Sequence, residues 1–232
     1  MKTGWLAPVP GRHTLGYWAD GSQEECAIFC AVTDRETLVA RWRANGWPVM
    51  VRRPVPGEPV PPGLQSGGGG REWVPVGIAL PPDEGKRRVR LWVRREAIAR
   101  WEPPCRLAEA LGSAPVAWQA WLGEVVRLFE AQGVEVWVYG ALLWQHLTGL
   151  AYVREAASDL DLLGTPGAGR RGAALTAFAR AAAAEGARPV DGEVFIPSLG
   201  WAAWRECLQT GTGTVLIKHD DGVFLAERAV CA

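Results

Sequence analysis

Apolar positions in the C-terminal half of the chain alternate between helical spacing and the short runs typical of buried strands. Helical spacing predicts helices over 116–133, 141–149 and 172–186. Short apolar runs predict strands over 134–140 and 158–164, and further short elements follow at 192–197, 202–207 and 213–219. Because strands and helices alternate, we expect an α/β (α+β) domain with a mixed sheet over residues 115–232.

The N-terminal half has a different pattern, in which short strands predominate. Apolar and polar residues alternate over 73–81 and 87–98, which predicts two strands. Upstream we predict a strand, a helix and a second strand over 25–32, 34–46 and 47–54. A proline- and glycine-rich loop is predicted over 55–72. Since Pro103–Pro104 then interrupts the chain, we expect a smaller β-rich domain over residues 1–104.

Charge and cysteine content exclude several classes of protein. Lys+Arg and Asp+Glu both number 25, so no bulk attraction to nucleic acid or to an anionic membrane is expected. The five cysteines are odd in number, have no C-x-x-C spacing and accompany only three histidines, which argues against a disulfide framework and against a zinc site. Without a signal-like N-terminus or an apolar run of about 18 residues, the chain is expected to be a reduced, cytoplasmic protein.

Two aspartates stand one residue apart in the predicted strand 158–164. Residues i and i+2 of a strand share a face, so Asp159 and Asp161 point the same way while Leu160 and Leu162 face the core. Two close carboxylates repel unless a cation lies between them or one takes up a proton. Mg²⁺ suits such a pair, bound by one or two carboxylates and substrate phosphates. The alternative is a pair of exposed aspartates on a solvated strand.

A glycine at the preceding strand-to-helix junction adds a second feature. The strand 134–140 ends in Gly140, and a helix follows directly. Glycine lets a phosphate approach the backbone, and a helix N-terminus offers it unpaired N–H groups. An anion cradle beside a metal-binding carboxylate pair is what phosphoryl transfer requires. The combination therefore favours phosphoryl-transfer chemistry over a solvated strand face.

This arrangement resembles the polymerase β-type nucleotidyltransferase superfamily, whose signature is a strand, Gly-Ser, a helix, and Asp-x-Asp on the next strand. The resemblance implies that Asp159 and Asp161 hold Mg²⁺, and that a third carboxylate comes from "VDGEVF". Asp191 and Glu193 share a strand face there, and Glu193 is the preferred candidate. Gly140–Ala141 replaces Gly-Ser, so the cradle keeps its backbone N–H groups and lacks the hydroxyl.

A closer resemblance covers most of the chain. The stretches "VYGALLWQHLTGLAYVREAASDLDLL", "VDGEVFIPSLGWAAWRE" and "VLIKHDDGVFL" are similar to the malonate decarboxylase holo-[acyl-carrier-protein] synthase family, also called phosphoribosyl-dephospho-CoA transferases. The resemblance implies that triphosphoribosyl-dephospho-CoA is the donor and that a serine of the apo acyl carrier protein of malonate decarboxylase is the acceptor. Pyrophosphate is then released, and the third carboxylate helps to deprotonate the serine.

Two other interpretations remain open at this point. The chain could be a different small nucleotidyltransferase that acts on a citrate lyase-type carrier or another acceptor. It could also be a non-catalytic binding subunit with the same fold, which Gly-Ala favours slightly and the intact Asp-x-Asp opposes.

Cations for the donor's phosphates are few. Arg52 and Arg53 end a predicted strand, and we expect one of them to reach the phosphates. Lys218 follows an apolar run in a chain with three lysines and is a further candidate for a phosphate contact. Structural roles are expected for His146, for Arg205 and Glu206, and for most of the thirteen tryptophans.

Overall fold

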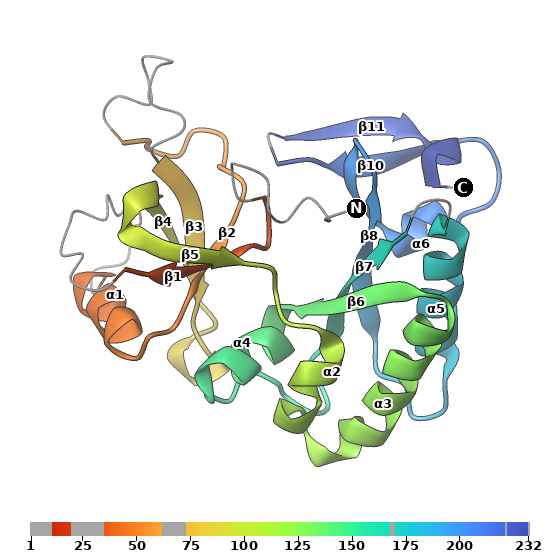
Figure 1. The fold of residues 1–232 in the computed structure, drawn as a ribbon, viewed down its shortest axis with the longest axis horizontal. Helices are drawn as coiled ribbons and strands as arrows, with labels where there is room; N and C mark the ends of the chain where they lie inside the picture. Colours follow the sequence, from red (N-terminus) through yellow and green to blue (C-terminus); the bar gives the residue numbers. More distant parts are fainter. Residues whose placement is uncertain (1–10, 20–34, 62–72, 168–169, 221, 232) are drawn as a thin grey trace. The chain divides into compact units, whose positions relative to one another are not determined.

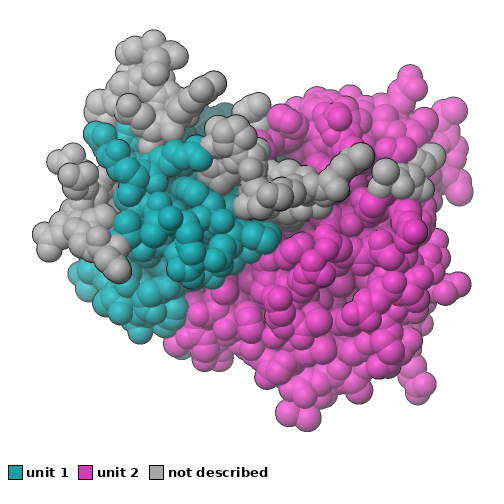
Figure 2. Space-filling view, viewed as in Figure 1, with its two compact units in different colours: residues 1–103 teal, residues 104–232 magenta. Residues whose placement is uncertain are grey.

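A computed structural model describes residues 11–19, 35–61, 73–167, 170–220 and 222–231. The chain forms two compact units, residues 1–103 and residues 104–232, which are coloured separately in Figure 2. The strand predicted over 25–32 lies outside the described residues, as does the part of the predicted loop from residue 62 onward. No helix of the described ranges combines the length and the apolar character that crossing a membrane requires.

The first unit contains a five-stranded sheet in which neighbouring strands run antiparallel. Its strand order is β4 (Arg88–Arg94), β3 (Trp73–Ala79), β2 (Val49–Val51), β1 (Leu15–Trp18) and β5 (Ile98–Glu102). Along β3 every second residue is buried, as its alternating sequence predicted. The helix α1 (Arg35–Ala44) buries Leu38, Val39 and Trp42. The helix predicted over 34–46 and the strands predicted over 47–54 and 73–81 are therefore present.

One predicted strand of this unit is in fact two. We expected a single strand over 87–98, but β4 ends at Arg94 and a 3₁₀ turn, Arg95–Ala97, follows it. The chain then enters β5, which pairs with β1 at the opposite edge of the sheet from β4. The alternation of apolar and polar residues shows which side chains are buried, but it does not show where the chain changes direction. It therefore did not reveal the 3₁₀ turn.

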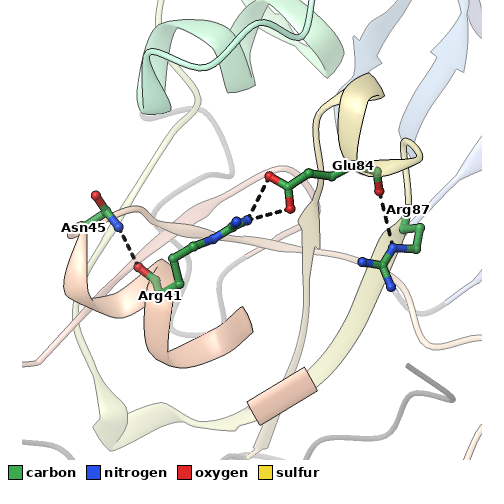
Figure 3. Close-up of polar contacts among 4 residues, drawn as sticks. All are labelled: Arg41, Asn45, Glu84 and Arg87. Carbon is green, nitrogen blue, oxygen red and sulfur yellow. Dashed lines mark hydrogen bonds and ion pairs between the residues drawn. The ribbon is translucent and has the colours of Figure 1, made fainter. Parts of the chain in front are cut away.

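An arginine on α1 connects this helix to a 3₁₀ turn, Pro82–Glu84, that lies far away in the sequence (Figure 3). Arg41 Nη2 donates to both carboxylate oxygens of Glu84, at 3.1 and 2.9 Å, and its carbonyl accepts from Asn45 Nδ2 at 2.8 Å. Arg87 Nε donates to the Glu84 carbonyl at 3.4 Å. Both partners of the ion pair are partly exposed, so we expect it to contribute less than about 1 kcal/mol.

The second unit is built on a six-stranded mixed sheet (Figure 1). Its order is β11 (Val223–Glu227), β10 (Thr214–Lys218), β9 (Gly200–Ala203), β8 (Val190–Ile196), β7 (Leu160–Pro166) and β6 (Val134–Tyr139). Strands β7 and β8 are parallel, and the other neighbours are antiparallel. The predicted α/β class with a mixed sheet is confirmed. The edge strand β11 was not predicted.

Helices α3 (Val116–Ala131) and α5 (Arg171–Ala183) pack together on one face of this sheet. Phe178 of α5 lies so close to β7 and β8 that a Cβ on Gly164 or Gly192 would meet its ring at 2.9 or 2.5 Å. The Phe178 ring also stacks on Trp204 and meets Phe129 edge-on. Side chains along a strand alternate between its two faces, and Gly164 faces the helices. Asp161, three residues before Gly164 on β7, therefore faces away from the two helices.

Three shorter helices complete this unit. They are α2 (Leu107–Ala110), α4 (Gly140–Thr148), which directly follows β6, and α6 (Trp204–Cys207). Cys207, at the end of α6, forms a disulfide with Cys231, in the final 3₁₀ turn. The expectation of wholly reduced cysteines is therefore wrong for this pair. Sequence spacing could not show it, because the two cysteines are 24 residues apart and the fold brings their Cα atoms to 5.6 Å.

Candidate active site

Three aspartates lie at the end of the sheet where β7 and β8 begin. Asp161 of β7 and Asp191 of β8 are direct cross-strand neighbours in the parallel register, and Asp161 is also opposite Tyr139 of β6. Asp159 directly precedes β7 and is exposed, as is Asp191, whereas Asp161 is half-buried. Acidic side chains at directly paired positions, such as Asp161 and Asp191, repel one another unless a cation or a proton lies between them. This end of the sheet is therefore suited to bind a cation.

Gly140 lies against the carboxylate of Asp161. A Cβ built on Gly140 would stand 2.6 Å from Asp161 Cγ and 3.0 Å from Asp161 Cβ. Gly140 also has a φ of +67°, which residues other than glycine rarely adopt. The sequence suggested that this glycine admits a phosphate to the backbone. In the structure it makes room for the Asp161 side chain.

The N-terminus of α4 lies beside this carboxylate. Its N-cap residue, Tyr139, makes no side-chain hydrogen bond to the first-turn N–H groups, and Ala141 is half-buried at the second helical position. First-turn N–H groups without a cap favour a negative charge next to them. The start of the helix is therefore suited to bind an anion beside Asp161.

Glu193 has quite different surroundings from Asp191, although both lie on the same face of β8. Glu193 is only 2% exposed, and its register neighbours are Leu163 on β7 and Ala203 on β9. Its Oε1 accepts a hydrogen bond from Lys218 Nζ at 2.6 Å. Asp191 is exposed, and its Oδ1 accepts from the Gly192 N–H at 2.8 Å. Of these two predicted carboxylates, Asp191 is therefore the direct neighbour of Asp161.

Arg52 is held by several contacts within the first unit. Its Nε donates to the Val76 carbonyl at 3.0 Å, and its Nη1 donates to Glu58 Oε1 at 2.9 Å. Nη1 also donates to the Arg53 carbonyl, and Nη2 donates to the Leu91 carbonyl at 3.4 Å. These contacts use most of the donors of the guanidinium and fix it against the sheet. The neighbouring Arg53 is half-buried.

The motif residues after Gly140 shape the segment that leads to the aspartates. Gln145 Oε1 accepts from the N–H groups of Tyr152 and Val153, at 3.1 and 2.9 Å. Thr148 Oγ1 accepts from the Leu150 N–H at 3.2 Å and donates to the Trp144 carbonyl at 2.7 Å. These bonds fix the turn after α4, so Gln145 and Thr148 of the stretch "WQHLTG" (residues 144–149) shape the first part of the segment between α4 and β7.

Other polar residues weighed as candidates have structural contacts. His146 Nδ1 is 2.9 Å from Ser113 Oγ. Arg205 donates to the Val190 carbonyl at 3.1 Å, and Glu206 accepts from the Leu216 N–H at 3.0 Å. The structural roles expected for these residues are confirmed.

The expectation that most tryptophans belong to the core is also confirmed, because the buried set contains Trp42, Trp92, Trp118, Trp121, Trp137, Trp144, Trp201 and Trp204.

Comparison with known proteins decides to which family this site belongs. The Phosphoribosyl-dephospho-CoA transferase MdcG C-terminal domain matches residues 106–229, and the MdcG N-terminal domain matches residues 11–104. The chain belongs to the phosphoribosyl-dephospho-CoA transferase family. The resemblance noted in the sequence is thereby confirmed, and the protein is an enzyme of the transferase class.

Relatives with this name match almost the whole chain. A phosphoribosyl-dephospho-CoA transferase of Xanthomonas campestris pv. campestris (strain 8004) is 33% identical over 220 residues, which are 95% of each chain. That of Xanthomonas euvesicatoria pv. vesicatoria (strain 85-10) is 35% identical over 225 residues, 95% of this chain and 96% of the relative. That of Bradyrhizobium diazoefficiens is 34% identical over 224 residues, 94% of this chain and 91% of the relative. No solved structure matches significantly.

Proposed function

We propose that the protein transfers the 2'-(5''-phosphoribosyl)-3'-dephospho-CoA group from its triphosphoribosyl precursor to a serine of the malonate decarboxylase acyl carrier protein. The serine oxygen forms a bond to the α-phosphorus, the bond from that phosphorus to the bridging oxygen breaks, and pyrophosphate leaves. The relatives' shared name supports the transferred group. The observation that carries the proposal is the contact of Gly140 with Asp161, which puts one carboxylate of the Asp-x-Asp motif beside a helix N-terminus.

The carboxylates fit a magnesium ion. Asp159 and Asp161 would hold it, because Mg²⁺ prefers oxygen ligands and commonly binds one or two carboxylates together with substrate phosphates. Within the described ranges no cluster of three or more His, Cys, Asp and Glu side chains forms a metal site, so donor oxygens and water would complete the coordination. A bound Mg²⁺ would neutralise charge on the donor's phosphate oxygens.

The chain's own groups would have separate tasks in this reaction. Asp191 would take up the serine proton as a general base, because it is exposed and lies beside Asp161 in the register. The N–H groups at the start of α4 would bind phosphate oxygens, and Gly140 would keep Asp161 and these N–H groups close to one another. Arg52 has no part in this assignment because its guanidinium is engaged within the first unit.

Mass spectrometry of intact carrier proteins tests the proposal. The protein is incubated with Mg²⁺, the triphosphoribosyl donor and an apo carrier from either malonate decarboxylase or citrate lyase. We expect the malonate decarboxylase carrier to gain the mass of one phosphoribosyl-dephospho-CoA group and an equal amount of pyrophosphate to appear. A carrier with its acceptor serine replaced by alanine is the control. A gain on the citrate lyase carrier alone would contradict the assigned acceptor, and no gain on either would contradict the proposed reaction.

A further inference from the structure

A buried carboxylate and a lysine form an ion pair on the same sheet face as the aspartates. Glu193 lies two residues after Asp191 on β8, so the two side chains leave the strand about 7 Å apart. Lys218 comes from β10, two strands away, and its Nζ reaches Glu193 Oε1 at 2.6 Å. Ala203, opposite Glu193 on the intervening strand β9, has only a methyl group as its side chain. The ion pair therefore spans the intervening strand β9.

The two members of the pair are buried to different extents. The Glu193 side chain is 3% exposed, whereas that of Lys218 is 26% exposed. A buried carboxylate is strongly unfavourable without a partner, so the ammonium group of Lys218 is held close to it. Among the described residues, Glu193 is the one side chain that the structure pairs with Lys218 Nζ. An ammonium group has three N–H donors, so two remain for another ligand.

The surroundings of Glu193 do not suit a metal ligand or a base for the acceptor. In the β7–β8 register Glu193 pairs with Leu163, whereas Asp191 pairs with Asp161. The Glu193 carboxylate also already binds the ammonium group of Lys218. A residue that must meet both a metal ion and an incoming serine needs access, which the exposed Asp191 has and Glu193 lacks. The pair has no net charge, and it holds the ammonium group of Lys218 at a defined position on this face of the sheet.

We propose that Glu193 is a positioning residue that holds Lys218 on the carboxylate face of the sheet, where its ammonium group binds phosphate oxygens of the donor. This inference rests on the proposed function, in which the donor's phosphates bind at the start of α4 beside Asp161 and the leaving pyrophosphate extends from there. A lysine fixed by an ion pair loses less conformational freedom on binding a phosphate than a free one does. The chain thus provides a cation for a triphosphate group in a site otherwise dominated by carboxylates.

Two substitutions and their combination separate this role from a merely structural one. Lys218→Met removes the ammonium group that neutralises the buried Glu193 carboxylate, so we expect both a lower Tm and a weaker affinity for inorganic triphosphate by about tenfold or more. The double variant Glu193→Gln/Lys218→Met removes the buried charge as well. We expect it to recover most of the Tm while its affinity for triphosphate stays weak. Recovery of both properties would overturn the proposal, because the pair would then matter only for stability.

Glu193→Gln alone tests the positioning role. We expect the KM for the donor to rise by about tenfold, because a neutral amide holds the Lys218 ammonium group less firmly than a carboxylate does, and kcat at saturating donor to stay within about threefold of the original. A large loss of kcat with an unchanged KM would overturn the proposal and make Glu193 a catalytic carboxylate. An unchanged KM and kcat would also overturn it.

Calorimetry with inorganic triphosphate, without donor or carrier, keeps this test independent of the proposed function. The matched control is Lys86→Met, which removes one of the other lysines at an exposed position of the first unit and should leave the affinity unchanged. If the unaltered protein binds triphosphate through Lys218 and transfers nothing to a carrier, the proposed function fails while the inference stands. If Lys218→Met binds triphosphate as tightly as Lys86→Met does, the inference fails regardless of transfer.

Discussion

Gly140 and Asp161 are in direct contact, with the Asp161 carboxylate in the space that a side chain at Gly140 would need. The glycine directly follows β6 and begins α4, and Asp161 lies opposite the preceding residue, Tyr139, in the β6–β7 register. A glycine is therefore required here for two reasons, the positive φ of +67° and the close approach of the carboxylate. The strand-to-helix turn and the Asp-x-Asp motif form one structural unit.

Gly140→Ala should therefore lower kcat by more than its loss of stability can explain. The added Cβ would displace the Asp161 carboxylate, and we expect kcat to fall by about 10²-fold or more because a misplaced catalytic group is that costly. Gly149→Ala is the matched control, since Gly149 has a φ of +73° and nothing within 4 Å of a built Cβ. Steady-state kinetics and thermal unfolding of both variants measure the difference. Equal losses of kcat would show that backbone strain alone is responsible.

Arg52 should be a stability residue of the first unit. Its side chain is 17% exposed and its partner Glu58 is 7% exposed, so Arg52→Ala leaves a largely buried carboxylate unpaired and should lower the free energy of unfolding by about 2–4 kcal/mol. Arg41→Ala is the control, because its ion pair with Glu84 is more exposed and should contribute less than about 1 kcal/mol. Urea denaturation measures both. An Arg52→Ala variant with normal stability and a raised KM for the donor would instead restore the phosphate-binding role expected from the sequence.

Cys105 should remain protonated in mildly alkaline solution. Burial raises the pKa of its thiol from 9.0 to about 12, and the nearby Glu109 carboxylate adds to the increase. The unfolded chain loses this proton at a lower pH than the folded chain, so the free energy of unfolding should fall as pH rises from about 9 towards 12. Urea denaturation of the protein and of Cys105→Ser at pH 8, 9 and 10 isolates this contribution. The same pH dependence in both proteins would contradict it.

Much of the second unit could be predicted because its elements have strong local patterns. The helices over 116–133 and 172–186 and the strands on either side of Gly140 were expected from spacing, and their ends differ from α3, α5, β6 and β7 by a few residues. The edge strand β11 was missed because it exposes Val223, Phe224 and Leu225, so it lacks the alternation that marks a half-buried strand. Local pattern therefore predicted the elements that have a distinct buried side.

The candidate site could be predicted only as far as its residue types and spacing allow. Asp159, Asp161 and Gly140 were identified because their motif is local. The choice between Asp191 and Glu193 depends on the β7–β8 register and on the ion pair with Lys218, which comes from a distant strand. In the same way Arg52 resembles a free cation in the sequence, and its partners Val76 and Leu91 become visible only in the folded sheet. Long-range pairing decides these roles.

Carrier modification by four carboxylate variants tests the central claim most directly. Asp159→Asn, Asp161→Asn, Asp191→Asn and Glu193→Gln each replace a carboxylate with an amide of nearly the same volume, and kcat is measured with saturating donor, carrier and Mg²⁺. The account predicts that the three aspartate variants lose about 10²-fold or more in kcat, as expected for groups that act on developing charge, while Glu193→Gln stays within about threefold. Near-normal turnover by Asp161→Asn, or a Glu193→Gln variant as inactive as the other three, would contradict it.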